Sequence, residues 1–213
     1  MLAGCGSAPS PAPETEREAP AASQPAAPAD GRPVIVAFGD SLTAGFGADT
    51  GKSYPDFLQQ DLDRAGMRYH VVNAGISGET TTDALARLNT VTALKPAVVI
   101  VEFGGNDGLR GLRIDDTRAN LDEIVRTLKG AGVKVALAGI SLPPDYGPDY
   151  IKQFDDTYTV LAKKYRVPML PFLLQDVYGV PGMMQRDQTH ATAKGNVVVA
   201  QNVKALVLPL LKK

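Results

Sequence analysis

Hydrophobic and polar positions along the chain follow two alternating periods, which predict strands and helices in turn. Nearly continuous apolar runs, typical of strands buried on both faces of a sheet, occupy residues 34–38, 69–73, 97–103, 133–140 and 167–170. Between them, apolar residues recur at helical spacing over residues 54–65, 81–94, 121–130, 149–165 and 193–211. Start and stop signals support these boundaries, as with Ser53 before the first helix and Gly66 after it.

This alternation predicts an α/β fold built on one doubly wound parallel sheet. Apolar strands need cover on both faces, and right-handed crossovers supply helices on both sides. We therefore expect a flavodoxin-like three-layer sandwich with five strands in the order 2-1-3-4-5, formed by residues 33–213. The carboxyl ends of its strands open on one edge, where such folds bind their ligands.

Residues 1–32 have a different pattern. They are rich in Pro and Ala and lack apolar periodicity, which is typical of a disordered linker. Leu2-Ala3-Gly4-Cys5 resembles the lipobox of bacterial lipoproteins, in which the cysteine becomes lipidated. We expect a lipid anchor at Cys5 and a location in the bacterial periplasm or cell envelope, the alternative being a plain disordered tail.

Composition narrows the functional classes. The 213 residues carry 22 Lys and Arg against 23 Asp and Glu, so no concentrated basic face for nucleic acid is expected. No apolar run is long enough to predict a membrane-spanning helix. The single cysteine excludes an internal disulfide framework. Neither of the two histidines has a plausible set of partner ligands, so we expect no metal, and no cofactor or protein partner is implied.

Polar residues after the strands point to acyl transfer. Ser41 follows the first strand, and a serine becomes a good nucleophile only when a base takes its proton. His190 is the better candidate base, because His70 begins the second strand at the opposite edge of the sheet. Asp187, three residues before His190, is placed to orient the imidazole, although it could simply cap a turn.

The negative charge of a tetrahedral intermediate needs donors already in place. Candidates are the backbone N–H groups of Ser41 and Gly78 and the side-chain amide of Asn106. Taken singly, Gly78 could serve a turn and Asn106 an Asx-turn. Their joint placement after the first three strands favours the functional interpretation.

Apolar residues on the loops at this edge are candidates for holding an acyl tail. They are Ile76, Leu109, Leu142 and Tyr146. The alternative is that they are ordinary loop anchors.

Four segments together resemble the signature blocks of the SGNH/GDSL hydrolases, in order: Gly39-Asp40-Ser41-Leu42, Gly78, Gly105-Asn106-Asp107 and Asp187-x-x-His190. The surrounding residues, including Gly104 to Gly111, are most similar to the bacterial multifunctional thioesterase/lysophospholipase/arylesterase subgroup.

The resemblance implies a serine esterase that hydrolyses carboxylic esters and thioesters, such as short- or medium-chain acyl or aryl esters, acyl thioesters or lysophospholipids. It also implies Ser41 as nucleophile, His190 as base, Asp187 as its partner, and Ser41, Gly78 and Asn106 as the oxyanion hole. One departure is Gln188-Thr189, where the family more often has Gly and an aliphatic residue, so the conformation of that loop is in question.

Two other functions are alternatives to ester hydrolysis. Gly51-Lys52-Ser53 before a helix suggests a phosphate-binding loop of a nucleotide hydrolase, but Phe46 stands where that motif requires glycine. The motif also does not follow the first strand directly. The second alternative is a non-catalytic lipid- or glycan-binding domain on the same fold.

Overall fold

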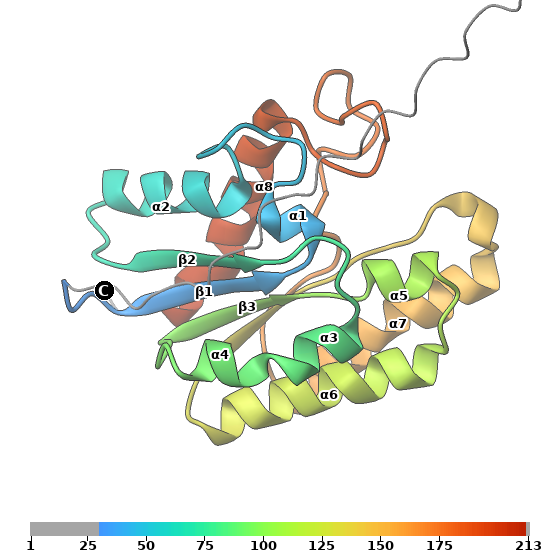
Figure 1. Cartoon of the computed structure of the whole chain (residues 1–213), viewed down its shortest axis with the longest axis horizontal. Helices are drawn as coiled ribbons and strands as arrows, with labels where there is room; N and C mark the ends of the chain where they lie inside the picture. Colours follow the sequence, from blue (N-terminus) through green and yellow to red (C-terminus); the bar gives the residue numbers. More distant parts are fainter. Residues whose placement is uncertain (1–29, 212–213) are drawn as a thin grey trace, which may run out of the picture.

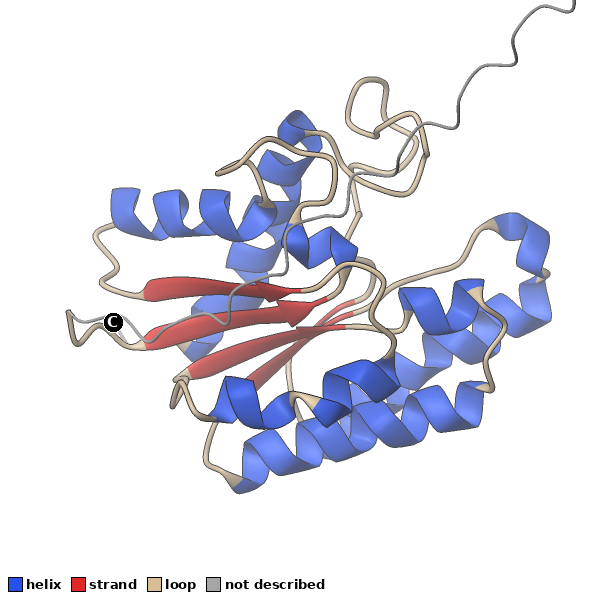
Figure 2. Ribbon diagram, viewed as in Figure 1, coloured by secondary structure: helices blue, strands red, loops and turns tan. Residues whose placement is uncertain are grey.

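The computed structural model describes residues 30–211, in which a parallel sheet lies between two layers of helices (Figures 1 and 2). Cys5 and the expected linker through residue 29 lie outside the described residues. The strands are β1 (Val34–Gly39), β2 (His70–Gly75), β3 (Val98–Glu102), β4 (Lys134–Ala138) and β5 (Met169–Leu170). Their order, β2-β1-β3-β4-β5, and their parallel pairing confirm the predicted fold class.

Helices cover both faces of the sheet. They are α1 (Ser41–Ala44), α2 (Tyr54–Arg64), α3 (Thr81–Ala86), α4 (Leu88–Thr92), α5 (Gly105–Leu109), α6 (Ile114–Gly130), α7 (Pro148–Tyr165) and α8 (Ala193–Val207), with 3₁₀ turns η1 (Pro144–Tyr146) and η2 (Leu208–Leu210). α2 packs against α8 on one face, and α6 packs against α3 and α7 on the other.

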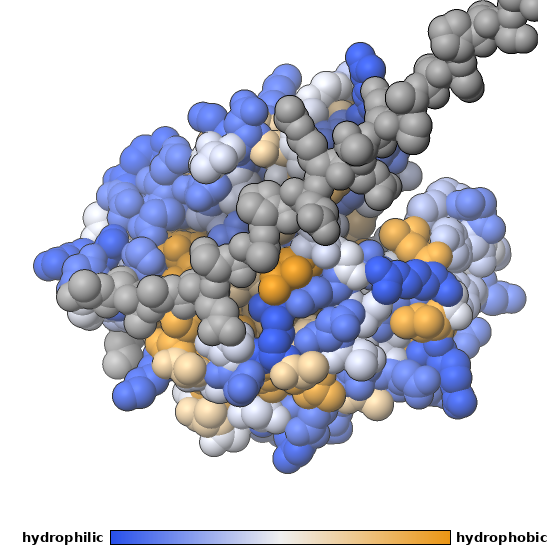
Figure 3. Space-filling model, in the orientation of Figure 1, coloured by the Kyte–Doolittle hydropathy of each residue, from blue (hydrophilic) through white to orange (hydrophobic). Residues whose placement is uncertain are grey.

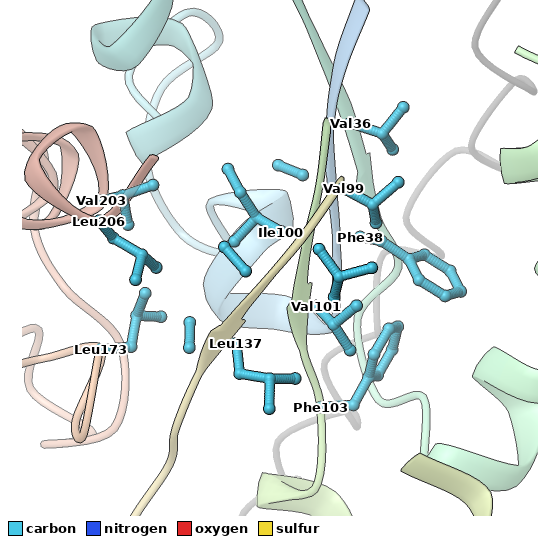
Figure 4. Close-up of a cluster of buried hydrophobic side chains, with 14 of the residues drawn as sticks. Val36, Phe38, Val99, Ile100, Val101, Phe103, Leu137, Leu173, Val203 and Leu206 are labelled. Atoms are coloured by element: carbon cyan, nitrogen blue, oxygen red, sulfur yellow. The ribbon is translucent and has the colours of Figure 1, made fainter. Parts of the chain in front are cut away.

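The two central strands form the middle of the core. β1 pairs with both β2 and β3, and all the residues of β1 and β3 are buried. Figure 4 shows Phe38 and Phe103 on one side of the sheet and Val203 of α8 on the other. The two phenylalanine rings meet edge to face, with centroids 4.7 Å apart. Burying an aromatic side chain of this kind stabilises a fold by about 1.5–3 kcal/mol.

Two expected helices differ from the structure. The helix expected over 81–94 is broken at Arg87, whose guanidinium pairs with Glu79, donates to the carbonyl of Ala74 and lies over the Phe38 ring. The helix expected over 193–211 ends at Val207. The chain then continues as a 3₁₀ turn containing Pro209, which has no N–H for an α-helical hydrogen bond.

Other boundaries differ in both directions, since α6 begins at Ile114 instead of residue 121, and two short helices were not predicted. The strand expected over 133–140 is Lys134–Ala138, and the last strand has only two residues. α1 and α5 follow β1 and β3 directly, so the first and third strand ends lead into helices instead of open loops.

The surface of the described residues is mostly hydrophilic on the face that is shown. On the face in Figure 3 hydrophilic residues predominate, and apolar ones occur in separate patches. Within residues 30–211, no helix has the length and hydropathy needed to cross a bilayer.

Candidate active site

The turn between β1 and α1 presents Ser41 at the carboxyl edge of the sheet. Asp40 caps α1, since its Oδ1 accepts a hydrogen bond from the Leu42 N–H at 3.0 Å. A Cβ at Gly39 would overlap the side chains of Thr43 and Glu102, so glycine is needed for the close approach of this turn. Ser41 is the first residue of α1, where a backbone N–H has no acceptor within the helix.

His190 and Asp187 complete a chain of hydrogen bonds with Ser41. The distance from Ser41 Oγ to His190 Nε2 is 2.8 Å, and that from His190 Nδ1 to Asp187 Oδ2 is 2.7 Å. Asp187 Oδ1 also accepts from the backbone N–H groups of Thr189 and His190. Partial burial opposes ionisation of Asp187, but these bonds outweigh it and lower the pKa of its carboxyl. A carboxylate at Nδ1 favours the tautomer with its proton there, leaving Nε2 to accept from Ser41.

The other histidine lies elsewhere. His70 is the first residue of β2 and its Nδ1 lies 3.2 Å from the Arg32 guanidinium, so it takes no part in this chain of bonds. Its position agrees with the choice of His190 as the candidate base.

The loop that carries Asp187 and His190 is held in place by Gln185, which lies outside every motif of the sequence. Its backbone N–H donates to the carbonyl of His190 at 2.8 Å. Its side-chain amide donates to the carbonyls of Phe46 and Ala191. The Phe46 ring in turn packs against the imidazole of His190, with centroids 4.7 Å apart. These contacts join segments about 140 residues apart, at positions with no shared sequence motif.

The unusual Gln188 takes the backbone conformation that glycine would take more easily. Its φ is +55°, in the left-handed region, which costs a residue with a side chain roughly 1–2 kcal/mol. Its Nε2 donates to the Gln185 carbonyl at 2.9 Å, which offsets part of that cost. The departure from the family pattern therefore leaves the Asp187 to His190 geometry intact.

Asn106 lines the same cavity as Ser41, and its amide bonds to Glu79, the residue after Gly78, whereas Gly78 itself is not among the lining residues. Asn106 is in the first turn of α5, and its Nδ2 donates to the carbonyl of Glu79 at 2.9 Å and to Asp40 Oδ2 at 3.2 Å. Gly78 has φ +84°, and its carbonyl accepts from Arg110. An added Cβ on Gly78 would meet only the Arg110 guanidinium, at 3.9 Å, so its backbone conformation, and not crowding, calls for glycine.

Two carboxyl groups are buried beneath the turn that carries Ser41. Glu102 is fully buried; its Oε2 accepts from the Thr43 hydroxyl at 2.7 Å and from the Asp40 N–H at 3.3 Å. Burial raises the pKa of Glu102 well above its usual value, and the nearby Asp40 raises it further. Burial likewise raises the pKa of Asp40 to about 7, against the opposing hydrogen bond from the Leu42 N–H. Neither group lies between Ser41 and His190.

Because the pKa values of these two buried carboxyl groups are raised, we expect the free energy of unfolding to fall as the pH rises. Between about pH 4 and 7 the folded protein holds protons that the unfolded chain has released, so folding becomes less favourable across that window. We expect the unfolding free energy to drop by about 2 kcal/mol from pH 5 to pH 8. Glu102→Gln keeps an oxygen acceptor for Thr43 but removes one ionisable group, so its drop is expected to be smaller. Urea unfolding of both proteins at the two pH values measures this, and a wild-type stability that is flat or rising contradicts it.

A cavity of about 570 Å³ opens beside Ser41. Ser41, Asn106 and His190 line it together with Leu109 and Leu142, two of the four expected substrate contacts. Further lining comes from residues 140–144 after β4, from α7 and from residues 171–178 after β5. Sequence reasoning missed the last of these segments because its apolar residues carry no motif.

The other two expected contacts are not among the lining residues. The Tyr146 hydroxyl donates a hydrogen bond to the carbonyl of Leu109, which is the role of a loop anchor. Ile76 is half-buried beside β2, and its N–H donates to the Gly39 carbonyl.

Nothing in the described residues favours phosphate or metal chemistry. Gly51-Lys52-Ser53 lies beyond α1, where Ser53 caps α2 and the Lys52 ammonium lies over the Phe57 ring. Within residues 30–211, no three His, Cys, Asp or Glu side chains gather as a metal site.

The chain is similar to known bacterial esterases over most of its length. Residues 37–198 match the GDSL-like Lipase/Acylhydrolase family. Esterase TesA of Pseudomonas aeruginosa is 42% identical over 83% of this chain and 89% of its own length. Thioesterase 1/protease 1/lysophospholipase L1 of Escherichia coli K12 is 37% identical over 83% of this chain and 84% of its own length.

The fold comparison agrees. A crystal structure of TesA superposes with a TM-score of 0.81 at 41% identity, covering 84% of this chain and 99% of that one. These relatives do not favour the nucleotide-hydrolase or non-catalytic alternatives. The chain belongs to the GDSL-like lipase/acylhydrolase family and is a serine esterase that acts on small-molecule or lipid esters.

Proposed function

We propose that the chain hydrolyses short- and medium-chain carboxylic esters and thioesters through an acyl-enzyme on Ser41. The observation that carries the proposal is the hydrogen-bond chain from Ser41 through His190 to Asp187, with 2.8 Å and 2.7 Å links, beside a cavity of acyl size. A named esterase and a named thioesterase/lysophospholipase among the relatives support the same substrate range.

In the first half-reaction Ser41 Oγ attacks the acyl carbonyl while His190 Nε2 takes the hydroxyl proton. The carbonyl oxygen becomes an oxyanion near the N–H groups of Ser41 and Gly78 and the amide of Asn106. Asp187 stabilises the imidazolium. When the tetrahedral intermediate collapses, His190 returns the proton to the leaving alcohol or thiol, and the acyl group remains on Ser41.

In the second half-reaction a water molecule replaces the alcohol. His190 takes a proton from the water as its oxygen attacks the acyl-enzyme. It then gives that proton to Ser41 Oγ, and the carboxylic acid leaves. The free enzyme is restored, and no cofactor is needed in either step.

Asn106→Ala is expected to lower turnover by about 10²–10³-fold, or ~2.7–4 kcal/mol, because one oxyanion donor is lost. Both hydrogens of the Asn106 amide are engaged, and the longer bond, to Asp40, is the one with which an oxyanion would compete. Steady-state hydrolysis of p-nitrophenyl butyrate measures the effect. Asn89→Ala, on the exposed surface of α4, is the matched control. Turnover within twofold of wild type would contradict the role of Asn106.

Acyl preference is tested with p-nitrophenyl esters of increasing chain length beside acyl-CoA. Because the cavity next to Ser41 is limited in volume, kcat/KM is expected to rise with chain length until the cavity is full and then to fall. A preference that keeps rising to the longest chains would contradict binding of the acyl group in this cavity.

We also propose that Cys5 carries a lipid that holds the esterase at the bacterial cell envelope. The support is the Leu2-Ala3-Gly4-Cys5 pattern and the Pro/Ala-rich stretch that follows it as a tether. Residues 1–32 would then be the tether and residues 33–213 the enzyme. Mass spectrometry of the native gene product is expected to find a diacylated cysteine at this position, and an unmodified Cys5 would refute the anchor.

A further inference from the structure

One wall of the acyl cavity carries a carboxylate that the proposed mechanism does not use. Asp155 of α7 lines the cavity, as do two hydroxyl residues, Ser141 and Thr159. Much of the remaining wall is apolar, with residues such as Ile140, Met169 and Phe172. A charged group in such a wall is a poor match for an unsubstituted alkyl chain.

The carboxylate of Asp155 is only partly satisfied by the protein. Its Oδ2 accepts one hydrogen bond, from the Ser141 hydroxyl at 3.2 Å. Its Oδ1 is buried and has no hydrogen-bond partner among residues 30–211, nor does any Lys or Arg of that part pair with Asp155. By contrast, the next residue, Asp156, is paired with Lys152 at 2.7 Å on the outer side of the helix. Oδ2 keeps acceptor capacity beyond the Ser141 bond, so the Asp155 carboxylate in the cavity wall can accept a further hydrogen bond there.

Whether the Asp155 carboxylate weakens or strengthens substrate binding depends on the chemical nature of the acyl group in the cavity. An alkyl chain filling the cavity would remove water from the carboxylate and offer no hydrogen bond in return, which is unfavourable. An acyl chain with a hydroxyl at the level of Asp155 would donate to the carboxylate at Oδ2, beside the hydrogen bond from Ser141.

We infer that Asp155 makes the acyl cavity selective for acyl groups that carry a hydroxyl over unsubstituted chains of the same length. This rests on the proposed function, in which the cavity holds the acyl group. Burial raises the pKa of Asp155, an effect that the Ser141 hydrogen bond opposes. A hydroxyl can pair with either protonation state of a carboxyl, whereas an ammonium group needs the ionised one, and this favours hydroxyacyl substrates.

The test compares p-nitrophenyl esters in matched pairs, with and without a hydroxyl along or at the end of hexanoyl, octanoyl and decanoyl chains. For each enzyme the kcat/KM of the hydroxyacyl ester is divided by that of its plain partner. This ratio does not depend on how much of a variant is folded. For the best hydroxyl position, Asp155→Leu is expected to lower the ratio by about 10- to 100-fold, the worth of a hydrogen bond to a charged group. Asp155→Asn, which keeps a carbonyl acceptor, is expected to fall between the two.

Asp156→Leu is the matched control, because it removes a neighbouring carboxylate that faces away from the cavity, and its ratio is expected to equal that of wild type. Ratios that agree within twofold between wild type and Asp155→Leu at every position would overturn the inference, while ester hydrolysis through Ser41 would still stand. A wild-type protein that hydrolyses none of the esters, or a Ser41→Ala variant that hydrolyses them equally well, would instead overturn the proposed function.

Discussion

Replacing Ser41 with alanine is expected to reduce ester turnover by about 10³-fold or more. The substitution removes the oxygen that lies 2.8 Å from His190 Nε2 and that would form the acyl-enzyme. The oxyanion donors and the cavity remain, so a residual rate above that in water is expected from binding and charge stabilisation alone. Asp40, and not Ser41, caps the short helix α1, and among the described residues the Ser41 hydroxyl bonds only to His190. Loss of this hydroxyl should therefore leave the fold intact.

Three measurements check this result. Hydrolysis of p-nitrophenyl acetate and butyrate gives the rate, and far-ultraviolet circular dichroism verifies the fold. A fluorophosphonate probe, which labels activated serines, is expected to modify wild type at Ser41 and to leave Ser41→Ala unlabelled. Turnover within tenfold of wild type, or labelling of the variant at the same rate, would show that Ser41 is not the nucleophile.

Replacing Asp187 with asparagine is expected to cost about 10³- to 10⁴-fold in kcat. The asparagine amide can present its N–H to His190 Nδ1, which then becomes an acceptor. The ring proton moves to Nε2, so the imidazole can no longer accept the proton of Ser41. The effect is large even though the Asp187 side chain is 41% exposed, because it depends on which nitrogen carries the proton and not on the strength of an ion pair.

Asp187→Asn separates tautomer control from a merely structural role. The variant keeps an oxygen for the backbone N–H groups of Thr189 and His190, so the loop should hold its shape and KM should change far less than kcat. The asparagine amide does not ionise, so raising the pH does not change which nitrogen of His190 carries the proton. A higher pH should therefore not restore the rate. Asp116→Asn, which neutralises an exposed carboxylate on α6, is the matched control. A kcat within tenfold of wild type would contradict the role of Asp187.

The sheet was predictable from local pattern. Apolar runs such as that of β1 are long, nearly unbroken and bounded by glycine, and burial on both faces permits little else. Boundaries were less predictable where a single side chain overrides periodicity. The helix is interrupted at Arg87, whose side chain pairs with Glu79 and bonds to carbonyls at the ends of β1 and β2. No sequence pattern near Arg87 indicates these contacts. Pro209 is the opposite case, since its missing N–H was visible in the sequence and the helix was nonetheless expected to run past it.

The candidate site was predictable to the extent that its residues follow strand ends. Ser41, Gly78 and Asn106 come after the first three strands, and parallel topology brings such positions to one edge. Gln185 and Phe46, which hold the loop and ring of His190, are apart from any strand end and from each other in sequence. Their contact depends on how two loops fold over each other, which no spacing rule predicts.

The fold and the class of chemistry were predictable because a candidate serine, one suitable histidine, a nearby carboxylate and the strand pattern are local properties of the chain. The set of side chains that share the cavity depends on the tertiary structure. It set Leu109 and Leu142 in the lining and Tyr146 outside it, and it brought Asp155 from α7 into the wall. It also placed Glu102 beneath the turn that carries Ser41, where burial raises the pKa of its carboxyl. Burial and cavity shape arise from contacts between distant segments, so they become visible only when the helices are packed on the sheet.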